Sequence, residues 1–345
     1  MGRPALILAA LAAEAAPELR FTRYLPVETL DVDQLELLSD SGETYLLRVP
    51  NTAGGERELS LEIRILASLQ PYAEQLPFQI PIRRGDTRDQ VGYQATLFTA
   101  LGGKTANPER LGPGEFSRSF AAALAGIHSL PLAVVRDGGL PDFDASAILH
   151  RKVAELDRMA ATGRVPAALL NRWEGAMEDV NLFRYRPTVV HGGITSSAIH
   201  LDGQRVIGLS NWQNLRIGDP AEDFVWLIQG TLENTQSDTV LTYRTIRSSA
   251  DENLQQRATL YSELAVGQWL LHLLDNESDN ESIAEAEDML ADLRSDLESG
   301  KLPELKSSSF IGMAAATSLL PEITRINTGA IEVVPETSSN PDELF

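Results

Sequence analysis

A change of pattern near residue 101 is the feature that most constrains the fold of this chain. Before it, short alternating stretches separated by turn residues predict strands. One helix interrupts them over 56–69, and its apolar residues recur at helical spacing, so we expect one face to pack on the sheet. The strands are expected at 20–24, 34–38, 44–49, 78–82 and 94–99.

After Pro113 the pattern is almost entirely helical. Phe116, Phe120, Leu124 and Ile127 form one apolar stripe that predicts a helix ending near His128. A single non-helical segment over 188–219 contains two strand-like pieces, 198–201 and 205–209, around the turn Asp202-Gly203. Further helices are expected at 144–161, 166–184, 221–231, 236–247, 251–275 and 280–298.

The order of these elements predicts an α+β protein with two lobes. We expect an N-terminal helix over 1–16, a small strand-rich lobe over 17–101 and a mainly helical lobe over 102–298. The 16 N-terminal residues also imitate a signal peptide, but Pro4 suits the first turn of a helix. Past Ser299 the composition is acidic and polar without periodicity, so we expect disorder over 299–345, with one apolar patch at 310–320 as a possible docking helix.

Composition excludes several classes of function. With 49 acidic against 29 basic residues, the formal charge is -20, which repels nucleic-acid phosphates and anionic lipid surfaces. The chain has no cysteine, which rules out disulfides and thiolate metal sites and fits a reducing compartment. No apolar run reaches the roughly 18–20 residues that span a bilayer. We therefore expect a cytoplasmic protein without nucleic-acid or membrane partners.

Four motifs in the helical part carry a resemblance to a known family. The run His191-Gly-Gly193-Ile-Thr-Ser-Ser-Ala198, followed by Ser210-Asn-Trp212, resembles the motifs H-G-D-x-x-x-x-N and I-D-W. Gly218-Asp-Pro-Ala-Glu-Asp223 matches G-D-P-A-x-D, and Ala125-Gly-Ile-His-Ser-Leu-Pro131 matches A-x-I-H-x-L-P. These are motifs of the aminoglycoside/macrolide phosphotransferase family, and the resemblance covers about residues 5–295.

The resemblance implies a protein-kinase-like fold, with ATP or GTP and Mg²⁺ as the family's cofactors. However, the catalytic Asp of the family falls on Gly193, which has no side chain to orient a hydroxyl or take a proton. The metal-binding Asn falls on Ala198, and the metal-binding Asp falls on Asn211, an uncharged and weak ligand for Mg²⁺. All three catalytic positions are altered, so we expect nucleotide and Mg²⁺ to bind weakly or not at all.

Other parts of the family's site have counterparts here. Arg48 falls where a phosphate-holding cation is expected, and Glu62 is its expected helix partner, with Glu58 one turn earlier as an alternative. The same two residues could form a surface ion pair with no further role. By resemblance, His191 braces the loop, and Asp219 caps and hydrogen-bonds the loop backbone, so both are interpreted as structural. Replacement metal ligands could come from acids nearby: Asp202, Glu222 and Asp223.

Two hypotheses remain open from the sequence. In the first, the chain is a pseudokinase that keeps the fold, has lost phosphoryl transfer, and serves binding or regulation through an unknown small molecule or protein. In the second, it is an active ATP- or GTP-dependent phosphotransferase that acts on a small hydroxylated molecule, macrolide- or aminoglycoside-like, and uses relocated ligands. Whether it is an enzyme depends on which hypothesis holds.

Overall fold

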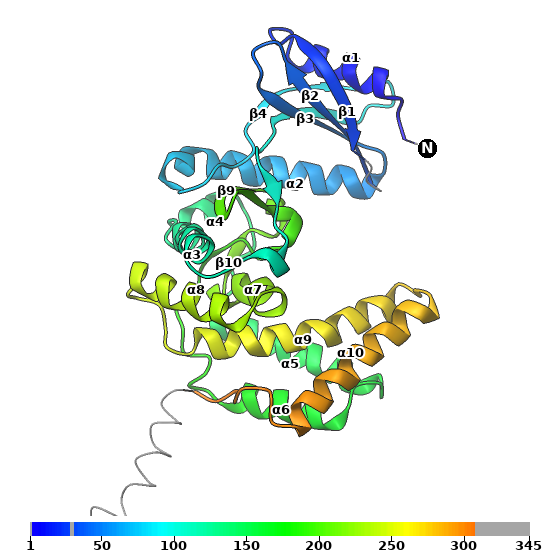
Figure 1. The fold of residues 1–345 in the computed structure, drawn as a ribbon. Helices are drawn as coiled ribbons and strands as arrows, with labels where there is room; N and C mark the ends of the chain where they lie inside the picture. The colour runs from blue at the N-terminus through cyan, green and yellow to red at the C-terminus, as the bar shows by residue number, and fades with distance from the viewer. Residues whose placement is uncertain (1, 28–30, 308–345) are drawn as a thin grey trace, which may run out of the picture.

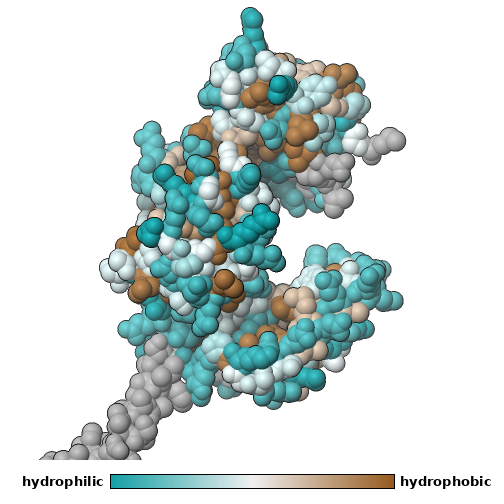
Figure 2. All heavy atoms as spheres, in the orientation of Figure 1, coloured by the Kyte–Doolittle hydropathy of each residue, from teal (hydrophilic) through white to brown (hydrophobic). Residues whose placement is uncertain are grey.

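The structure is a computed structural model, and it describes residues 2–27 and 31–307. A small strand-rich lobe lies above a larger helical lobe, with one long helix between them (Figure 1). The predicted α+β, two-lobe architecture is therefore confirmed. Figure 2 shows one face of the molecule deeply hollowed between the small lobe and the projecting end of the last two helices.

The small lobe is built on one five-stranded antiparallel sheet in the order β1-β2-β3-β5-β4. Alternate residues of the central strands, such as Leu35, Leu47 and Leu97, are buried on one face, where the apolar residues of the N-terminal helix α1 cover them. The elements of this lobe are α1 (Ala5–Ala15), β1 (Phe21–Val27), β2 (Val32–Ser39), β3 (Thr44–Pro50), α2 (Ala53–Leu69), η1 (Gln70–Gln75), β4 (Arg83–Arg88) and β5 (Gln94–Thr99).

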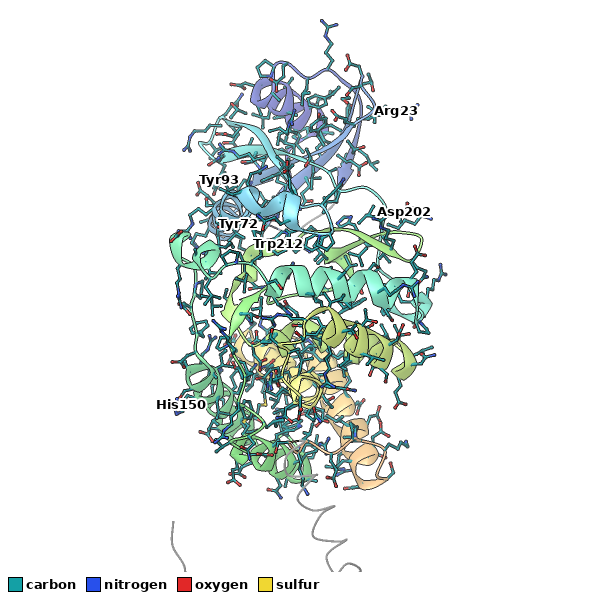
Figure 3. The ribbon with its side chains drawn as sticks, turned by 90° about the vertical axis from the view of Figure 1, so that its left-hand side faces the viewer. Arg23, Tyr72, Tyr93, His150, Asp202 and Trp212 are labelled. Atoms are coloured by element: carbon teal, nitrogen blue, oxygen red, sulfur yellow. The ribbon has the colours of Figure 1, made fainter. Side chains whose placement is uncertain are left out.

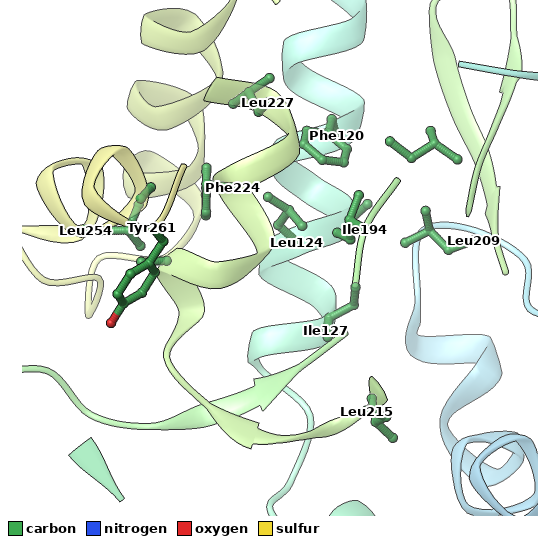
Figure 4. Close-up of a cluster of buried hydrophobic side chains, with 14 of the residues drawn as sticks. Phe120, Leu124, Ile127, Ile194, Leu209, Leu215, Phe224, Leu227, Leu254 and Tyr261 are labelled. Carbon is green, nitrogen blue, oxygen red and sulfur yellow. The ribbon is translucent and has the colours of Figure 1, made fainter. Parts of the chain in front are cut away.

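The helical lobe has one continuous core. Its centre is the predicted stripe of α3, whose Phe120, Leu124 and Ile127 are fully buried against the surrounding loops and helices (Figure 4). The elements are β6 (Lys104–Thr105), η2 (Pro108–Arg110), α3 (Glu115–His128), α4 (Ala133–Asp137), α5 (Ala145–Ala161), α6 (Ala167–Glu178), β7 (Thr188–Val190), η3 (Ser196–Ala198), β8 (Ile199–Asp202), β9 (Arg205–Leu209), η4 (Trp212–Asn214), β10 (Arg216–Gly218), η5 (Pro220–Phe224), α7 (Val225–Gly230), α8 (Glu233–Ile246), α9 (Leu254–Asp275) and α10 (Asn280–Glu298).

The packing of α2 differs from the prediction. The Thr52 hydroxyl caps this helix by accepting a hydrogen bond from the Gly55 amide at 3.1 Å, so the helix begins at Ala53 rather than Glu56. Its buried leucines, Leu59, Leu66 and Leu69, belong to the core of the helical lobe, where α2 contacts η4 and α4. The apolar face therefore joins the small lobe to the large one instead of covering the sheet.

The predicted strand at 78–82 is also wrong. Phe78 and Ile80 alternate with exposed residues because they insert into the core of the helical lobe, and only Gln79 forms a single bridge, to Gly208. The strand lies just downstream, at β4, where the sequence is polar because the strand is at the edge of the sheet. There Gly85 passes so close to α1 that a Cβ would lie 1.9 Å from the carbonyl oxygen of Ala15.

The last described residues pack on the helical lobe. Helix α6 ends at Glu178, six residues before its predicted end, because the Asp179 carboxylate turns the chain by accepting a hydrogen bond from the Asn181 amide at 3.1 Å. The same carboxylate accepts a hydrogen bond from the Ser307 amide at 2.9 Å.

The expected apolar patch at 310–320 and most of the expected acidic tail lie outside the described residues. No described helix is both long enough and apolar enough to span a bilayer.

Candidate functional site

The loop that follows β7 carries the first candidate residue, His191. Its side chain is fully buried, and its Nε2 lies 2.9 Å from the Ser210 carbonyl oxygen. The imidazole packs against Trp212, with ring centroids 4.5 Å apart. Burial lowers the pKa of His191 below its ordinary value of 6.5, so the ring is neutral near pH 7. These contacts suit a residue that supports the loop.

The backbone of the loop is held by Asp223. Its Oδ2 accepts a hydrogen bond from the His191 amide at 2.8 Å, and its Oδ1 accepts one from the Gly192 amide at 2.7 Å. Oδ2 also lies 3.0 Å from Nε2 of His128, which projects from the end of α3. Burial alone would raise the pKa of Asp223, but the hydrogen bond from His128, the neighbouring imidazoles and the Gly192 amide outweigh burial and hold the pKa below 3.8. Both oxygens of this carboxylate thus already have hydrogen-bond partners.

The structure corrects the contact expected of Asp219. This carboxylate caps η5 by accepting a hydrogen bond from the Ala221 amide at 2.9 Å. Its other partners are the guanidinium of Arg257, with Nε at 2.6 Å and Nη2 at 3.0 Å, and the hydroxyl of Tyr261 at 2.8 Å. Asp219 therefore connects η5 to α9, while Asp223, four residues later, is the residue that hydrogen-bonds the loop.

The position of the family's catalytic Asp is partly filled by another side chain. A Cβ placed on Gly193 would lie 2.6 Å from Nδ2 of Asn214, closer than a carbon and a nitrogen can approach. Gly192 has a φ of +75°, and a Cβ there would lie 2.6 Å from the carbonyl oxygen of Asn214, so glycine is required. The loop is thus packed closely against η4. No pattern in the sequence indicates this role of Asn214.

The two other altered positions offer little to a metal ion. Ala198 is fully buried, and its methyl group has no donor atom. Asn211 adopts a left-handed conformation, with a φ of 62°, which Asn tolerates better than most residues. Its side-chain nitrogen lies 3.4 Å from the Ser197 hydroxyl. The site here holds a carboxamide and a hydroxyl, and no carboxylate.

The expected pair of Arg48 and Glu62 is formed. Arg48 lies on the face of β3 opposite to Leu47, so its guanidinium points to α2 and pairs with the Glu62 carboxylate. The side chain of Glu62 is 5% exposed and that of Arg48 is 18% exposed, so this is not a surface pair. Glu58, the alternative partner, is exposed.

None of the three acids considered as replacement ligands faces the altered positions as a free carboxylate. Asp202 is exposed in the turn between β8 and β9, at the outer edge of the molecule and away from Trp212 (Figure 3). Glu222 pairs with the Arg216 guanidinium, and Asp223 holds the loop. Within residues 2–27 and 31–307, no three Asp, Glu or His side chains converge as a metal site would require. The donors present do not fit Mg²⁺.

Comparison with protein families gives a match over most of this architecture. The model of the phosphotransferase enzyme family matches residues 26–265, which include strands β2 to β5 of the small-lobe sheet, the loop and the first half of α9. No curated protein matches the chain.

Solved structures match the fold over nearly their whole length. A macrolide 2'-phosphotransferase type I is 24% identical, with a TM-score of 0.67 over 82% of this chain and 95% of its own. A macrolide 2'-phosphotransferase from Brachybacterium faecium is 18% identical, with a TM-score of 0.70 over 83% and 98%. An aminoglycoside 2'-phosphotransferase in complex with GDP is 15% identical, with a TM-score of 0.66 over 84% and 98%. The chain therefore has the protein-kinase-like fold.

Proposed function

The chain belongs to the phosphotransferase enzyme family, and from this premise we propose that it is a pseudokinase: it keeps the fold and the supports of the loop, but it does not transfer a phosphoryl group. The observation that carries the proposal is that Gly193 brings no side chain to the position that the resemblance gives to the catalytic Asp. Where phosphoryl transfer requires a carboxylate beside the substrate hydroxyl, this loop offers a bare backbone with an amide packed against it.

The metal side of the site supports the same proposal. Phosphoryl transfer relies on positive charge at the phosphates, most of it supplied by Mg²⁺. Ala198 offers no donor atom to a metal, and Asn211 offers one neutral amide. The Asp223 carboxylate already contacts His128 and accepts hydrogen bonds from two loop amides. Because these donors do not fit Mg²⁺, we assign no catalytic step to it.

Arg48 lies on β3, where the family resemblance predicts a phosphate-holding cation. Several of the similar structures are described as complexes with GDP or ADP. In this chain the Arg48 cation is held by Glu62 and remains partly exposed. We therefore propose that nucleotide binds weakly, through its phosphates, and without help from Mg²⁺. The cleft between the two lobes then has a binding or regulatory role, with a small molecule or a protein as partner.

Restoring the missing groups tests this proposal. The variant combines Gly193→Asp, Ala198→Asn and Asn211→Asp with Asn214→Ala, because a new Cβ at residue 193 needs the space of the Asn214 amide. Asn214→Ala alone is the matched control. Phosphate release from ATP and GTP is measured with macrolide and aminoglycoside acceptors, alongside the thermal shift that Mg²⁺-nucleotide causes.

We expect wild type and control to release phosphate at the background rate. The restored variant should gain a Mg²⁺-dependent thermal shift, and a gain in transfer rate of about 10²–10⁴ where an acceptor is found. Transfer by the wild type as fast as by the restored variant would contradict the proposal and favour the active phosphotransferase with relocated ligands.

A further inference from the structure

A cavity of about 320 Å³ lies in the helical lobe. Its walls come from the end of α3 and the following Ser129–Leu132, from the segment Arg186–Thr188 that enters β7, from Pro220, and from the chain between α8 and α9. None of the altered catalytic positions lines it. The cavity is therefore separate from the site described above.

Two arginines give this cavity a positive charge. Arg186 and Arg247 both line it, and within residues 2–27 and 31–307 neither forms an ion pair with a carboxylate. The one acid in the lining, Asp251, is already held by Arg257, with N–O distances of 2.7 and 2.9 Å. Arg247 is half-buried and Arg186 is exposed, and together they give the lining a positive charge in a protein whose formal charge is -20.

Neutral polar groups accompany the arginines. The hydroxyls of Ser129 and Ser249 belong to exposed residues of the lining. Thr188 is only 4% exposed, and its hydroxyl has no hydrogen-bond partner. Buried hydroxyls are normally satisfied, so the Thr188 hydroxyl in the wall of this cavity is free to hydrogen-bond a bound group.

Arg247 is held in place by a chain of buried hydrogen bonds. Its Nη1 donates to the Tyr243 hydroxyl at 3.1 Å, and that oxygen lies 2.7 Å from Nδ1 of His128. His128 in turn contacts Asp223 through its Nε2. A guanidinium oriented before binding loses less conformational entropy when a ligand arrives. Tyr243 is therefore a positioning residue for Arg247.

We propose that this cavity binds a small oxyanion, the carboxylate or phosphate group of a diffusible molecule, between the guanidiniums of Arg186 and Arg247. Planar guanidiniums match the paired oxygens of both groups and remain charged at any physiological pH. The ligand class follows from the charge and the donors, since the arginines and the hydroxyls of the lining offer hydrogen-bond donors to an acceptor-rich group. This site does not depend on the proposed function of the loop.

Calorimetric titrations of the full chain at low ionic strength test the proposal, with inorganic phosphate in one arm and malonate in the other. Arg186→Ala and Arg247→Ala should each weaken binding about ten- to a hundredfold, the loss expected for a hydrogen-bonded charge. Tyr243→Phe should weaken it less, and Arg247→Lys should restore part of the loss caused by alanine. Arg23→Ala, at an exposed position of β1, is the matched control and should bind like wild type.

A further variant separates this cavity from the cleft. If phosphate bound at the family's nucleotide position, Arg48→Met would abolish binding while Arg186→Ala would not, and that result would overturn the proposal. Failure of both phosphate and malonate to bind wild type would overturn it as well. Thermal unfolding of each variant establishes that a lost signal reflects the site and not the fold. None of these titrations contains nucleotide, so their outcome is independent of the phosphoryl-transfer test.

Discussion

The two sides of the loop after β7 differ sharply in their polar contacts. On the buried side, Asp223 joins His128 to two loop amides, and His191 reaches the Ser210 carbonyl. On the other side, Gly193 carries no side chain, and the buried Ala198 at the end of the loop has no polar group. The contacts that fix the shape of the loop and the groups that would perform chemistry are therefore separate sets of residues. A chain of this fold can lack the second set and still form the loop, because the first set suffices.

The largest loss of stability is expected when a buried charge near the loop is removed. Arg257→Ala removes a fully buried cation and leaves Asp219 and Asp251 without it. Breaking a buried pair in this way costs about 3–5 kcal/mol, because the remaining charge is not solvated. Chemical denaturation measures the free energy of unfolding. The control is Arg158→Ala, whose ion pair with Asp275 is exposed and should contribute under about 1 kcal/mol. Equal losses in the two variants would contradict this interpretation.

A smaller loss is expected for Asp223→Asn. The amide keeps one acceptor oxygen for the loop but places an NH₂ group against a backbone N–H or against His128. An unsatisfied buried donor costs about 1–3 kcal/mol. Hydrogen exchange at the His191 and Gly192 amides should accelerate more than exchange in the sheet of the small lobe. If exchange at these two amides were unchanged, Asp223 would not be the support of the loop.

The buried side should also make stability depend on pH. The folded-state pKa of His191 is lowered by burial, so below about pH 6.5 the unfolded chain binds a proton that the folded chain refuses. The free energy of unfolding should therefore fall as the pH drops through 6.5. Asp223 has a lowered pKa, so its stabilisation is present above pH 3.8 and is lost as the pH falls through its folded-state value.

Denaturation midpoints between pH 8 and pH 4 measure this dependence. His191→Gln should reduce the loss below pH 6.5. It should not remove that loss entirely, since burial also lowers the pKa of His200. A profile that stays flat from pH 8 to pH 5 in wild type would contradict the assignment of a buried, neutral His191.

The smallest effect is expected on the other side of the loop. Asn214 is exposed and contacts Gly193 without a required hydrogen bond. Asn214→Ala should change the free energy of unfolding by no more than about 0.5 kcal/mol, as for most surface substitutions. A loss comparable with that of Asp223→Asn would mean that both sides support the loop equally.

The sequence predicted most of the fold where apolar periodicity reflects the packing partner. The stripe of α3 and the alternation of β3 were found where expected. Prediction failed at 78–82, where alternation arises from insertion into the other lobe, and at β4, an edge strand with polar side chains. The face of α2 was recognised, but periodicity cannot tell which of two cores buries it.

The site was predictable in part for a similar reason. The sequence placed Arg48 beside Glu62 and identified the three altered positions by resemblance. It assigned the support of the loop to Asp219, because Asp219 and Asp223 stand four residues apart in one motif and only the fold decides which carboxylate reaches the loop amides. The roles of Asn214 and Tyr243 depend on contacts between distant segments, which no local pattern encodes.

The central claim is that the cleft lacks the ligands for Mg²⁺, and one calorimetric measurement tests it most directly. ATP and GTP are titrated into the full chain with Mg²⁺ and again with a metal chelator. If the cleft lacks these ligands, any nucleotide binding is weak and has the same dissociation constant in both conditions, since Arg48 is the phosphate contact that we propose. A dissociation constant that becomes about tenfold lower or more with Mg²⁺, a change of about 1.4 kcal/mol, would contradict the account.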